Sequence, residues 1–314
     1  MLQYNRIDRK KFIHRSVRKY WPLYLLLIPV ITWFLIFCYY PMYGIIIAFK
    51  DYSPRLGILG SHWAENNGLQ HFIWLFNTNG FTRALKNTVI ISLLKIVFCF
   101  PIPIILSLFL NELRIPKLKK SIQTAIYLPF FISWVVIGGI VYDLLAVNGG
   151  IINNIRLLLG LDRVSYMTEA GNFYVILLLS EIWKGAGWGT VIYIAGISGV
   201  DPTFYEVAAI DGAGRFKCMW YITIPCISPI IITMFILQVG NILNAGFDSI
   251  FNLYNASVYS VADILDTYAY RIGISEGLVE PATALGLFKA AINFVLLLIC
   301  NKVVALMTGH GLYD

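Results

Sequence analysis

Six apolar runs constrain this chain more than any other feature of its sequence. A helix needs about 20 predominantly apolar residues to cross the hydrocarbon core of a bilayer, and each of these runs reaches that length. They cover residues 22–49, 88–110, 122–145, 173–198, 225–245 and 283–307. Because lipid offers the backbone no hydrogen-bond partner, a spanning segment must be a helix or part of a closed barrel, and runs this long exclude barrel strands. The sequence predicts an all-α, polytopic membrane protein with six transmembrane helices.

The composition also favours a membrane protein over a soluble domain. Of the 314 residues, 58% are hydrophobic and only 13% are charged. Soluble domains carry about 25% charged residues. The formal net charge of +7 does not indicate nucleic-acid binding, because no basic soluble module lies outside the apolar runs. We therefore expect membrane lipid around this chain and no nucleic-acid partner.

Lysine and arginine are concentrated in segments that should share one side of the membrane. Such residues favour the cytoplasmic side. They lie before the first run, after the second and after the fourth: Arg6, Arg9, Lys10, Lys11, Arg15, Arg18 and Lys19; Arg114, Lys117, Lys119 and Lys120; Arg215 and Lys217. We predict a basic cytoplasmic tail over residues 1–21, a six-span domain over 22–314, and both termini in the cytoplasm.

The cytoplasmic segment 201–224 carries signals for a short helix, a sharp turn and a second short helix. Asp201 can cap the first helix, and Pro202 suits its first turn. The helix should stop at Asp211-Gly212, because glycine accepts backbone angles that other residues resist. Pro225 then opens the fifth apolar run.

The spacing within this segment resembles the cytoplasmic coupling loop of binding-protein-dependent ABC importer permeases. That motif runs Glu-Ala-Ala, three residues, Gly, nine residues, Ile, any residue, Leu-Pro. In this chain an apolar residue replaces the first Ala, and Ile replaces the Leu. The residues that carry the resemblance are Glu206, Val207, Ala208, Ala209, Gly212, Ile222, Ile224 and Pro225.

Other segments are similar to a carbohydrate-permease subfamily related to the maltose permeases, which includes bacterial polysaccharide and oligosaccharide importers. The likeness extends from about residue 20 to the end of the chain. It is carried by Tyr20-Trp21-Pro22, Tyr39-Tyr40-Pro41, Phe49-Lys50-Asp51-Tyr52, Ile182-Trp183-Lys184, Asp266-Thr267-Tyr268 and Gly286-Leu287-Phe288-Lys289.

The resemblance implies a place in a bacterial cytoplasmic membrane and a set of partners. A second homologous permease subunit would complete the pathway, and an external solute-binding protein would deliver an oligosaccharide. Two cytoplasmic ATPase subunits would hold the coupling loop, with Glu206 in an ATPase cleft. The residues that the resemblance implicates in coupling are Glu206, Ala208, Ala209, Asp211, Gly212 and Pro225.

The sequence contains no Gly-x4-Gly-Lys-Ser/Thr phosphate loop, so an ATP site of that kind must lie on another polypeptide. We predict that this chain binds no cofactor and that ATP and Mg²⁺ bind to partner subunits. No catalytic constellation is present, and the histidines lack metal-ligand spacing. We therefore predict neither an enzyme nor a metal site.

Four charged residues, Lys95, Glu181, Lys184 and Lys289, fall within the apolar runs. Charges inside a membrane are costly and indicate function. Glu181 and Lys184 are three residues apart on one helical face and could pair. For the lysines, snorkelling to the membrane surface, pairing and substrate contact remain open.

Polar and aromatic residues of the fourth and fifth runs are candidates for a sugar path. Trp188 offers a flat face for a sugar ring, and the amides at 238, 241 and 244 would share one helical face. The alternatives are interfacial anchoring for the tryptophan and interhelical hydrogen bonds for the amides. With the positions that the maltose-permease resemblance adds, the predicted substrate path is Lys184, Gly185, Trp188, Gln238, Asn241 and Asn244.

Two further helices are predicted between the apolar runs. An amphipathic piece over 72–76 should lie at the membrane interface. A helix over 261–273 has an acid-rich face, which would either contact an external partner or be solvated.

We expect a permease subunit of an ATP-driven importer of oligosaccharides or polysaccharide fragments. An ABC permease for another polar solute, such as a peptide or an amino acid, is the first alternative. An ATPase-independent secondary transporter is the second, and it would transport without any ATPase partner.

Overall fold

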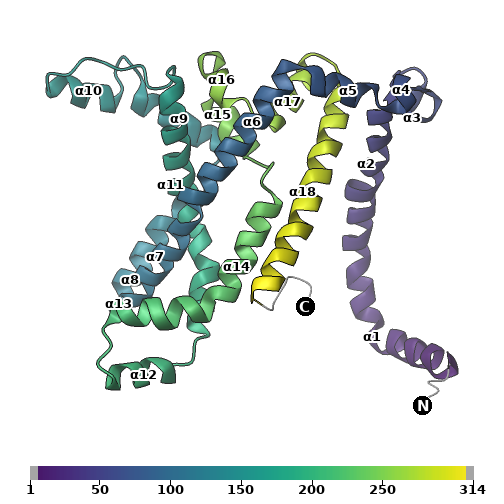
Figure 1. The fold of residues 1–314 in the computed structure, drawn as a ribbon. Helices are drawn as coiled ribbons and strands as arrows, with labels where there is room; N and C mark the ends of the chain where they lie inside the picture. The colour runs from purple at the N-terminus through teal and green to yellow at the C-terminus, as the bar shows by residue number, and fades with distance from the viewer. Residues whose placement is uncertain (1–5, 309–314) are drawn as a thin grey trace. The chain divides into compact units, whose positions relative to one another are not determined.

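The computed structural model describes residues 6–308, and it describes side chains for residues 19–306. Residues 1–5, at the start of the predicted tail, and residues 309–314, at the end of the predicted six-span domain, lie outside this range. The described chain is helical over most of its length (Figure 1). It forms two compact units, Met1–His71 and Phe72–Asp314, which are treated separately below. The boundary between tail and domain near residue 21 stays a prediction.

The first unit is dominated by one long apolar helix. It consists of α1 (Arg6–Phe34), a π-helical turn (Leu35–Tyr39), α2 (Tyr40–Met42) and a 3₁₀ segment (Tyr43–Phe49). The stretch Lys19–Phe49 is long and apolar enough to cross a membrane, and no residue of its most apolar window is buried within the chain. An apolar helix without cover from its own chain requires lipid or another protein around it.

A small ordered cap follows this helix. Strand β1 (Lys50–Asp51) pairs antiparallel with β2 (His62–Trp63), and the short helices α3 (Gly57–Gly60) and α4 (Glu65–Gly68) complete it. The Lys50 ammonium is buried and donates to the carbonyl oxygens of Ile58 and Leu59. This two-residue ladder is absent from the all-α prediction, because strands so short leave no period in the sequence.

The second unit contains four further candidate spans. They correspond to the predicted runs 88–110, 173–198, 225–245 and 283–307, with shifted ends. The second span comprises α6 (Asn79–Leu94), a π-helical turn (Lys95–Cys99) and α7 (Pro101–Glu112). The fourth is α11 (Ala170–Ser198), and the sixth is α18 (Val279–Thr308). The fifth comprises α13 (Arg215–Cys218), a π-helical turn (Met219–Thr223) and α14 (Ile224–Gly240).

The predicted run 122–145 is not one straight helix. It consists of α8 (Pro116–Tyr127), a 3₁₀ turn (Leu128–Phe131) and α9 (Trp134–Leu145), and the two parts meet at 100°. Pro129 cannot donate a backbone hydrogen bond, and Ser133 is extended and accepts from the Val136 amide as an N-cap. Counting this bent pair as one, the described residues hold six candidate spans.

Shorter helices lie between the spans. The amphipathic prediction over 72–76 corresponds to α5 (Gln70–Asn77), and α10 (Ile151–Leu158) precedes the fourth span. Between the fifth and sixth spans lie α15 (Phe247–Leu253), a 3₁₀ turn (Ala256–Val258), α16 (Tyr259–Ala262), α17 (Leu265–Tyr270) and a π-helical turn (Arg271–Ser275).

The predicted helix over 261–273 is therefore wrong in its continuity. It breaks at Asp263, whose side chain is fully buried and accepts from Thr267 Oγ1 and both terminal nitrogens of Arg271. Asp266 pairs with Lys289 on α18. The acid-rich face is consequently not presented to solvent: one carboxylate is buried and the other is paired.

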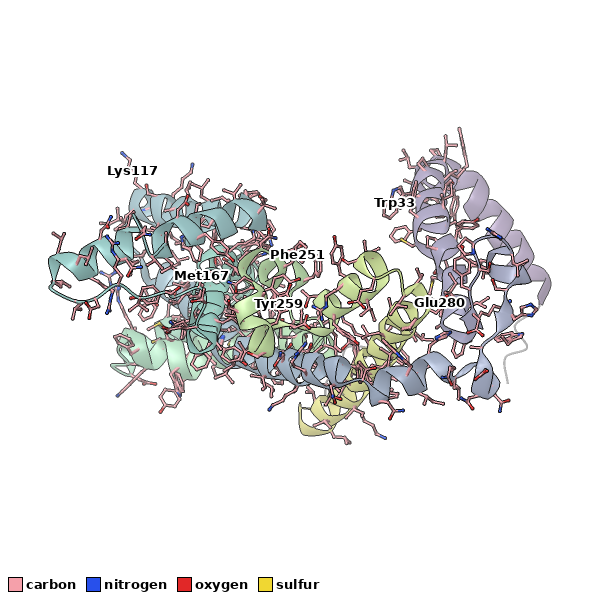
Figure 2. All side chains as sticks on the ribbon, turned by 90° about the horizontal axis from the view of Figure 1, so that it is seen from above. Trp33, Lys117, Met167, Phe251, Tyr259 and Glu280 are labelled. Carbon is pink, nitrogen blue, oxygen red and sulfur yellow. The ribbon has the colours of Figure 1, made fainter. Side chains whose placement is uncertain are left out.

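Two apolar clusters organise the second unit. One joins α6, α11, α15 and α16 and includes Ile91, Leu177 and Ile250. Nearby, Asn255 Nδ2 donates to the Met167 carbonyl oxygen over 2.7 Å. Figure 2, seen from above, labels Met167 and Tyr259 in the same region of the unit. The other cluster joins α7, α11 and α14 near the opposite end of α11 and comprises Leu108, Ile197, Met219 and Ile227.

Even the best-covered span, α11, has only 28% of its most apolar window buried. Most residues in these windows are therefore exposed or half-buried within the chain, which leaves much of each span to be covered by lipid or a partner.

Candidate coupling loop and transport cavity

The predicted coupling segment forms a compact helix outside the spans. Helix α12 (Thr203–Ile210) lies at the end of the second unit opposite α10 (Figure 1). The Asp201 carboxylate accepts from the Thr203 amide at 2.9 Å, so its predicted capping role is confirmed. This hydrogen bond lowers the pKa of Asp201, because it favours the ionised carboxylate.

The end of α12 is set by local backbone geometry. Gly212 has a φ of +71°, which a residue with a Cβ rarely adopts. The Gly212 amide donates to the Ala209 carbonyl oxygen (3.1 Å), and the Ala213 amide donates to that of Ala208 (2.9 Å). This double closure is a Schellman motif, and it places the helix stop at Asp211-Gly212, as predicted.

Helix α12 presents an apolar side and a carboxylate to the outside. Phe204, Val207 and Ile210 recur every third residue and are 55%, 58% and 86% exposed. Glu206 is also exposed, one residue from Val207. A helix outside the spans gains nothing from large exposed apolar side chains unless another surface covers them. The geometry suits a helix seated in the groove of a partner protein.

The chain then returns to the fifth span through a widened turn. Pro225 lies in the first turn of α14 and cannot donate a backbone hydrogen bond, so the preceding turn opens into a π-helix. Tyr205 Oη on α12 lies 2.9 Å from Thr223 Oγ1, which is buried. Arg215 pairs with Glu112 at the end of α7 over 3.7 Å. These contacts attach the loop to two spans.

A cavity of about 260 Å³ lies between the second, fourth and fifth spans. Of the predicted substrate-path residues, Gly185 and Gln238 line it. Its other polar lining includes Lys95, Glu181 and Tyr193. Its apolar lining includes Phe100, Pro103, Ile182 and Met234.

Lys95 and Glu181 form an ion pair in this lining. Lys95 Nζ also donates to the Ala245 carbonyl oxygen over 2.7 Å. The predicted pairing of Glu181 with Lys184 is therefore wrong, and so is snorkelling of Lys95, which is 9% exposed. A partner 86 positions away in the sequence leaves no local pattern, so sequence reasoning missed it.

Lys184 points instead to the bend of the third span. Its ammonium donates to the carbonyl oxygens of Phe130 and Ile132, and it lies 5.5 Å and 5.7 Å from the ring centroids of Phe130 and Trp134. The bend leaves carbonyl oxygens without helical donors, and a cation satisfies them.

Trp188 stacks on Phe130 with ring centroids 4.7 Å apart and the ring planes 9° apart. Neither Lys184 nor Trp188 lines the cavity.

The three amides of the fifth run do not share a helical face as predicted. Helix α14 ends at Gly240, so Asn241 is its C-cap and Asn244 lies in the following turn. Asn244 Nδ2 donates to Asn241 Oδ1 over 3.0 Å, and both side chains are exposed. Gly240 packs against Leu297, where an added Cβ would come within 3.0 Å of the leucine.

A second ionic group lies at the opposite end of the unit from α12. The buried Asp263 carboxylate pairs with Arg271, and this hydrogen-bonded contact raises the pKa of the guanidinium. Arg271 lies over the rings of Tyr259 and Tyr268, 5.4 Å from each centroid. Burial, and to a lesser extent the hydrogen bond between Tyr254 and Tyr259, raises the pKa of Tyr254 to about 12. Lys289 pairs with Asp266 on α17, so the structure supports the pairing alternative for Lys289.

Comparison with known proteins identifies a family and several relatives with the same architecture. Residues 89–308 match the family model described as "Binding-protein-dependent transport system inner membrane component". The chain is 42% identical to the polygalacturonan/rhamnogalacturonan transport system permease protein YteP of Bacillus subtilis (strain 168), over 97% of this chain and 94% of the relative.

Two solved structures are also similar. One is a crystal structure of a bacterial ABC transporter that imports the acidic polysaccharide alginate, with a TM-score of 0.85 and 39% identity over 94% of this chain and 99% of that chain. The other shows a bacterial alginate ABC transporter in complex with an alginate pentasaccharide-bound periplasmic protein, with the same TM-score and identity over 95% and 99%. With more than two thirds of its length matched by the family model, the chain belongs to the inner membrane components of binding-protein-dependent transport systems.

Proposed function

We propose that this chain is one permease subunit of an ATP-driven bacterial importer of oligosaccharides or polysaccharide fragments. The observation that carries the proposal is α12, a capped helix outside the spans whose apolar side and Glu206 are exposed. The likeness of the whole chain to a polygalacturonan/rhamnogalacturonan permease and to an alginate importer supports the substrate class.

The partners follow from what this chain lacks and exposes. It carries no phosphate loop, so ATP and Mg²⁺ would bind to two cytoplasmic ATPase subunits that receive α12. Arg215 and Lys217 in the 201–224 segment favour its cytoplasmic placement, together with the N-terminal tail and the C-terminus. A second homologous permease subunit would complete the pathway. An external solute-binding protein would deliver the sugar, in keeping with the similar alginate transporter, which forms a complex with an alginate pentasaccharide-bound periplasmic protein.

The geometry supports a direct mechanical route from ATPase to cavity. Closure of the ATPases would displace α12, held at Glu206 by charge-assisted hydrogen bonds. The Tyr205–Thr223 contact would pass the displacement to the first turn of α14. Gln238, on the last turn of the same helix, lines the cavity. Alternating access would then be a switch between two packings of the spans.

The cavity supports a substrate held through hydroxyl groups. Glu181 neutralises Lys95, and Lys184 donates to carbonyl oxygens at the bend of the third span and does not line the cavity, so no unpaired cation lies among the cavity's lining residues. Gln238 offers an amide that bonds sugar hydroxyls as donor and acceptor. We propose that this chain holds the sugar rings and that carboxylate recognition, where the substrate is acidic, lies mainly on the binding protein or the second permease subunit.

Uptake in cells tests the proposal. A strain lacking the gene for this chain would be given labelled trigalacturonate, an alginate trimer, maltotriose and a tripeptide, with and without the restored gene. We expect the gene to restore uptake of at least one uronate oligomer and not of the tripeptide. We also expect inactivation of the ATPase that copurifies with the chain to abolish that uptake. Unchanged uptake without the ATPase would favour a secondary transporter, and restored uptake of the tripeptide alone would favour another polar solute.

A further inference from the structure

Helix α10 has the opposite polarity from a short helix packed on a protein. At 3.6 residues per turn, Ile151, Ile155 and Leu158 fall on one side and Asn153 falls on the other. Asn153 is fully buried, whereas Ile151, Ile155 and Leu158 are 57%, 49% and 87% exposed. The polar side of α10 therefore faces the protein, and its apolar side faces away.

Asn153 fixes this orientation. Its Nδ2 donates to the carbonyl oxygens of Ala146 and Val164, each at 3.0 Å, and its Oδ1 accepts from the Val164 amide at 2.9 Å. These bonds use the amide in both directions and join the two ends of the loop around α10. Rotating the helix to cover its apolar side would break all of them and leave the buried groups unsatisfied.

The position of α10 puts its apolar side at the level of the membrane surface. It follows α9, which ends at Leu145, and precedes α11, which begins at Ala170, and both belong to spans. Figure 1 draws α10 across the direction of these two helices, at the end opposite α12. A helix that lies across the spans at this level meets headgroups and the upper acyl chains.

The loop around α10 carries two arginines: Arg156 falls on the same side of the helix as Asn153, and Arg163 follows the helix. Arg156 Nε donates to the Asp162 carbonyl oxygen (2.9 Å) and Arg163 donates to Asn148 Oδ1 (2.6 Å), so each keeps further N–H donors available. Arginine on the polar side of an amphipathic helix is typical of helices that lie in the interface, where the guanidinium meets lipid phosphate. The exposed apolar residues continue past the helix at Leu159 and Leu161.

We propose that α10 is an interfacial helix. It would lie on the membrane surface opposite the 201–224 loop, with Ile151, Ile155 and Leu158 in the acyl region. Lipid is favoured over a protein partner because the apolar side lies level with the span ends and because Arg156 and Arg163 of the same loop keep N–H donors suited to phosphate. The inference does not depend on the transported substrate or on the ATPases.

Collision accessibility of a spin label tests the placement. The label is attached at Leu158→Cys in a full-length chain whose five native cysteines are replaced by serine or alanine, reconstituted in vesicles of phosphatidylcholine and phosphatidylglycerol. We expect label collisions with oxygen to exceed collisions with a water-soluble nickel chelate severalfold. The matched control, Asp162→Cys, is exposed and polar and should show the reverse. Equal chelate access at both positions would overturn the proposal.

A second measurement avoids the cysteine replacements. Benzoylphenylalanine in place of Leu158 is photoactivated in cells that express the native partners. Crosslinks to phospholipid are expected. Crosslinks to a second permease subunit or to the external binding protein, without lipid adducts, would show that a protein covers α10 and would refute the lipid assignment.

Discussion

The hydroxyl groups of Tyr205 on α12 and Thr223, the last residue of the π-helical turn before α14, lie 2.9 Å apart. Thr223 is 2% exposed and also donates to the Cys218 carbonyl oxygen, so it belongs to the base of the span. A displacement of α12 must therefore either move Thr223 or break this contact. The relationship connects the segment that we assign to the ATPase with the helix that carries Gln238.

Tyr205→Phe should weaken coupling without removing the docking surface. A neutral hydrogen bond contributes about 1 kcal/mol, which corresponds to roughly a fivefold change in an equilibrium. We expect uptake per ATP hydrolysed to fall by roughly that factor while the ATPase still copurifies. Tyr221→Phe is the matched control, because Tyr221 lies on the same loop and is 74% exposed. The transmission role fails if both variants transport alike.

Glu206→Lys should separate ATP hydrolysis from uptake. The carboxylate is exposed on α12, so its replacement costs the fold little, but it places a like charge where we expect a cationic partner group. We expect uptake to fall roughly 5- to 150-fold, the usual range of a coupling free energy of 1–3 kcal/mol, with unchanged membrane content. The Glu206→Gln variant should lose less uptake than the Glu206→Lys variant. Normal uptake by the lysine variant would refute the coupling assignment.

Lys95→Met should destabilise the protein more than a joint replacement with Glu181. Removing one member of a buried ion pair leaves an unpaired charge and costs about 3–5 kcal/mol, whereas replacing both by apolar groups is often neutral. We expect Lys95→Met with Glu181→Leu to recover much of the melting temperature lost in Lys95→Met. The melting temperatures of the single and the double variant are measured by heating the purified proteins and monitoring the folded fraction by size-exclusion chromatography. Equal losses would mean that the pair contributes no mutual stabilisation.

The features that sequence reasoning found are those encoded locally. A run of some 20 apolar residues identifies a span wherever it packs. The stop at Asp211-Gly212 needs only the backbone freedom of Gly212 and the carbonyl oxygens of the preceding turn. The family resemblance depends on the spacing between such local signals, and for that reason it could be recognised before any tertiary contact was known.

The features that sequence reasoning missed depend on partners distant in the sequence. Glu181 has a lysine three positions away, yet it pairs with Lys95 on another helix, because the break of the third span presents carbonyl oxygens to Lys184. Helix α14 ends before Asn241, at Gly240, which packs against the distant Leu297. Neither choice can be made from helical periodicity, which assumes that the helix continues and that neighbours along it are available.

Gly187→Ala should disrupt the packing of the fourth span on the third, whereas Gly185→Ala should not. An added Cβ at 187 would lie 1.9 Å from the Ile126 carbonyl oxygen, whereas at 185 nothing lies within 4 Å. We expect Gly187→Ala to cost about 1–3 kcal/mol, the range for overpacking, measured as lost melting temperature. Gly185→Ala should fold normally and reduce only uptake, because it narrows the cavity. Equal stability of both variants would contradict the close approach.

Gln238→Ala and Trp188→Ala should separate substrate binding from packing. Gln238 lines the cavity, and loss of one hydrogen bond to a sugar hydroxyl, about 1 kcal/mol, should raise the KM of uptake roughly fivefold at unchanged melting temperature. Trp188 instead stacks on Phe130 at the bend of the third span, so its truncation should lower the melting temperature first. Trp188→Phe should restore stability, because it keeps a ring for the stack. Uptake kinetics and thermal unfolding on the same preparations test this division. A raised KM at native stability in Trp188→Ala would return the tryptophan to the sugar path, and lost stability in Gln238→Ala would remove the glutamine from it.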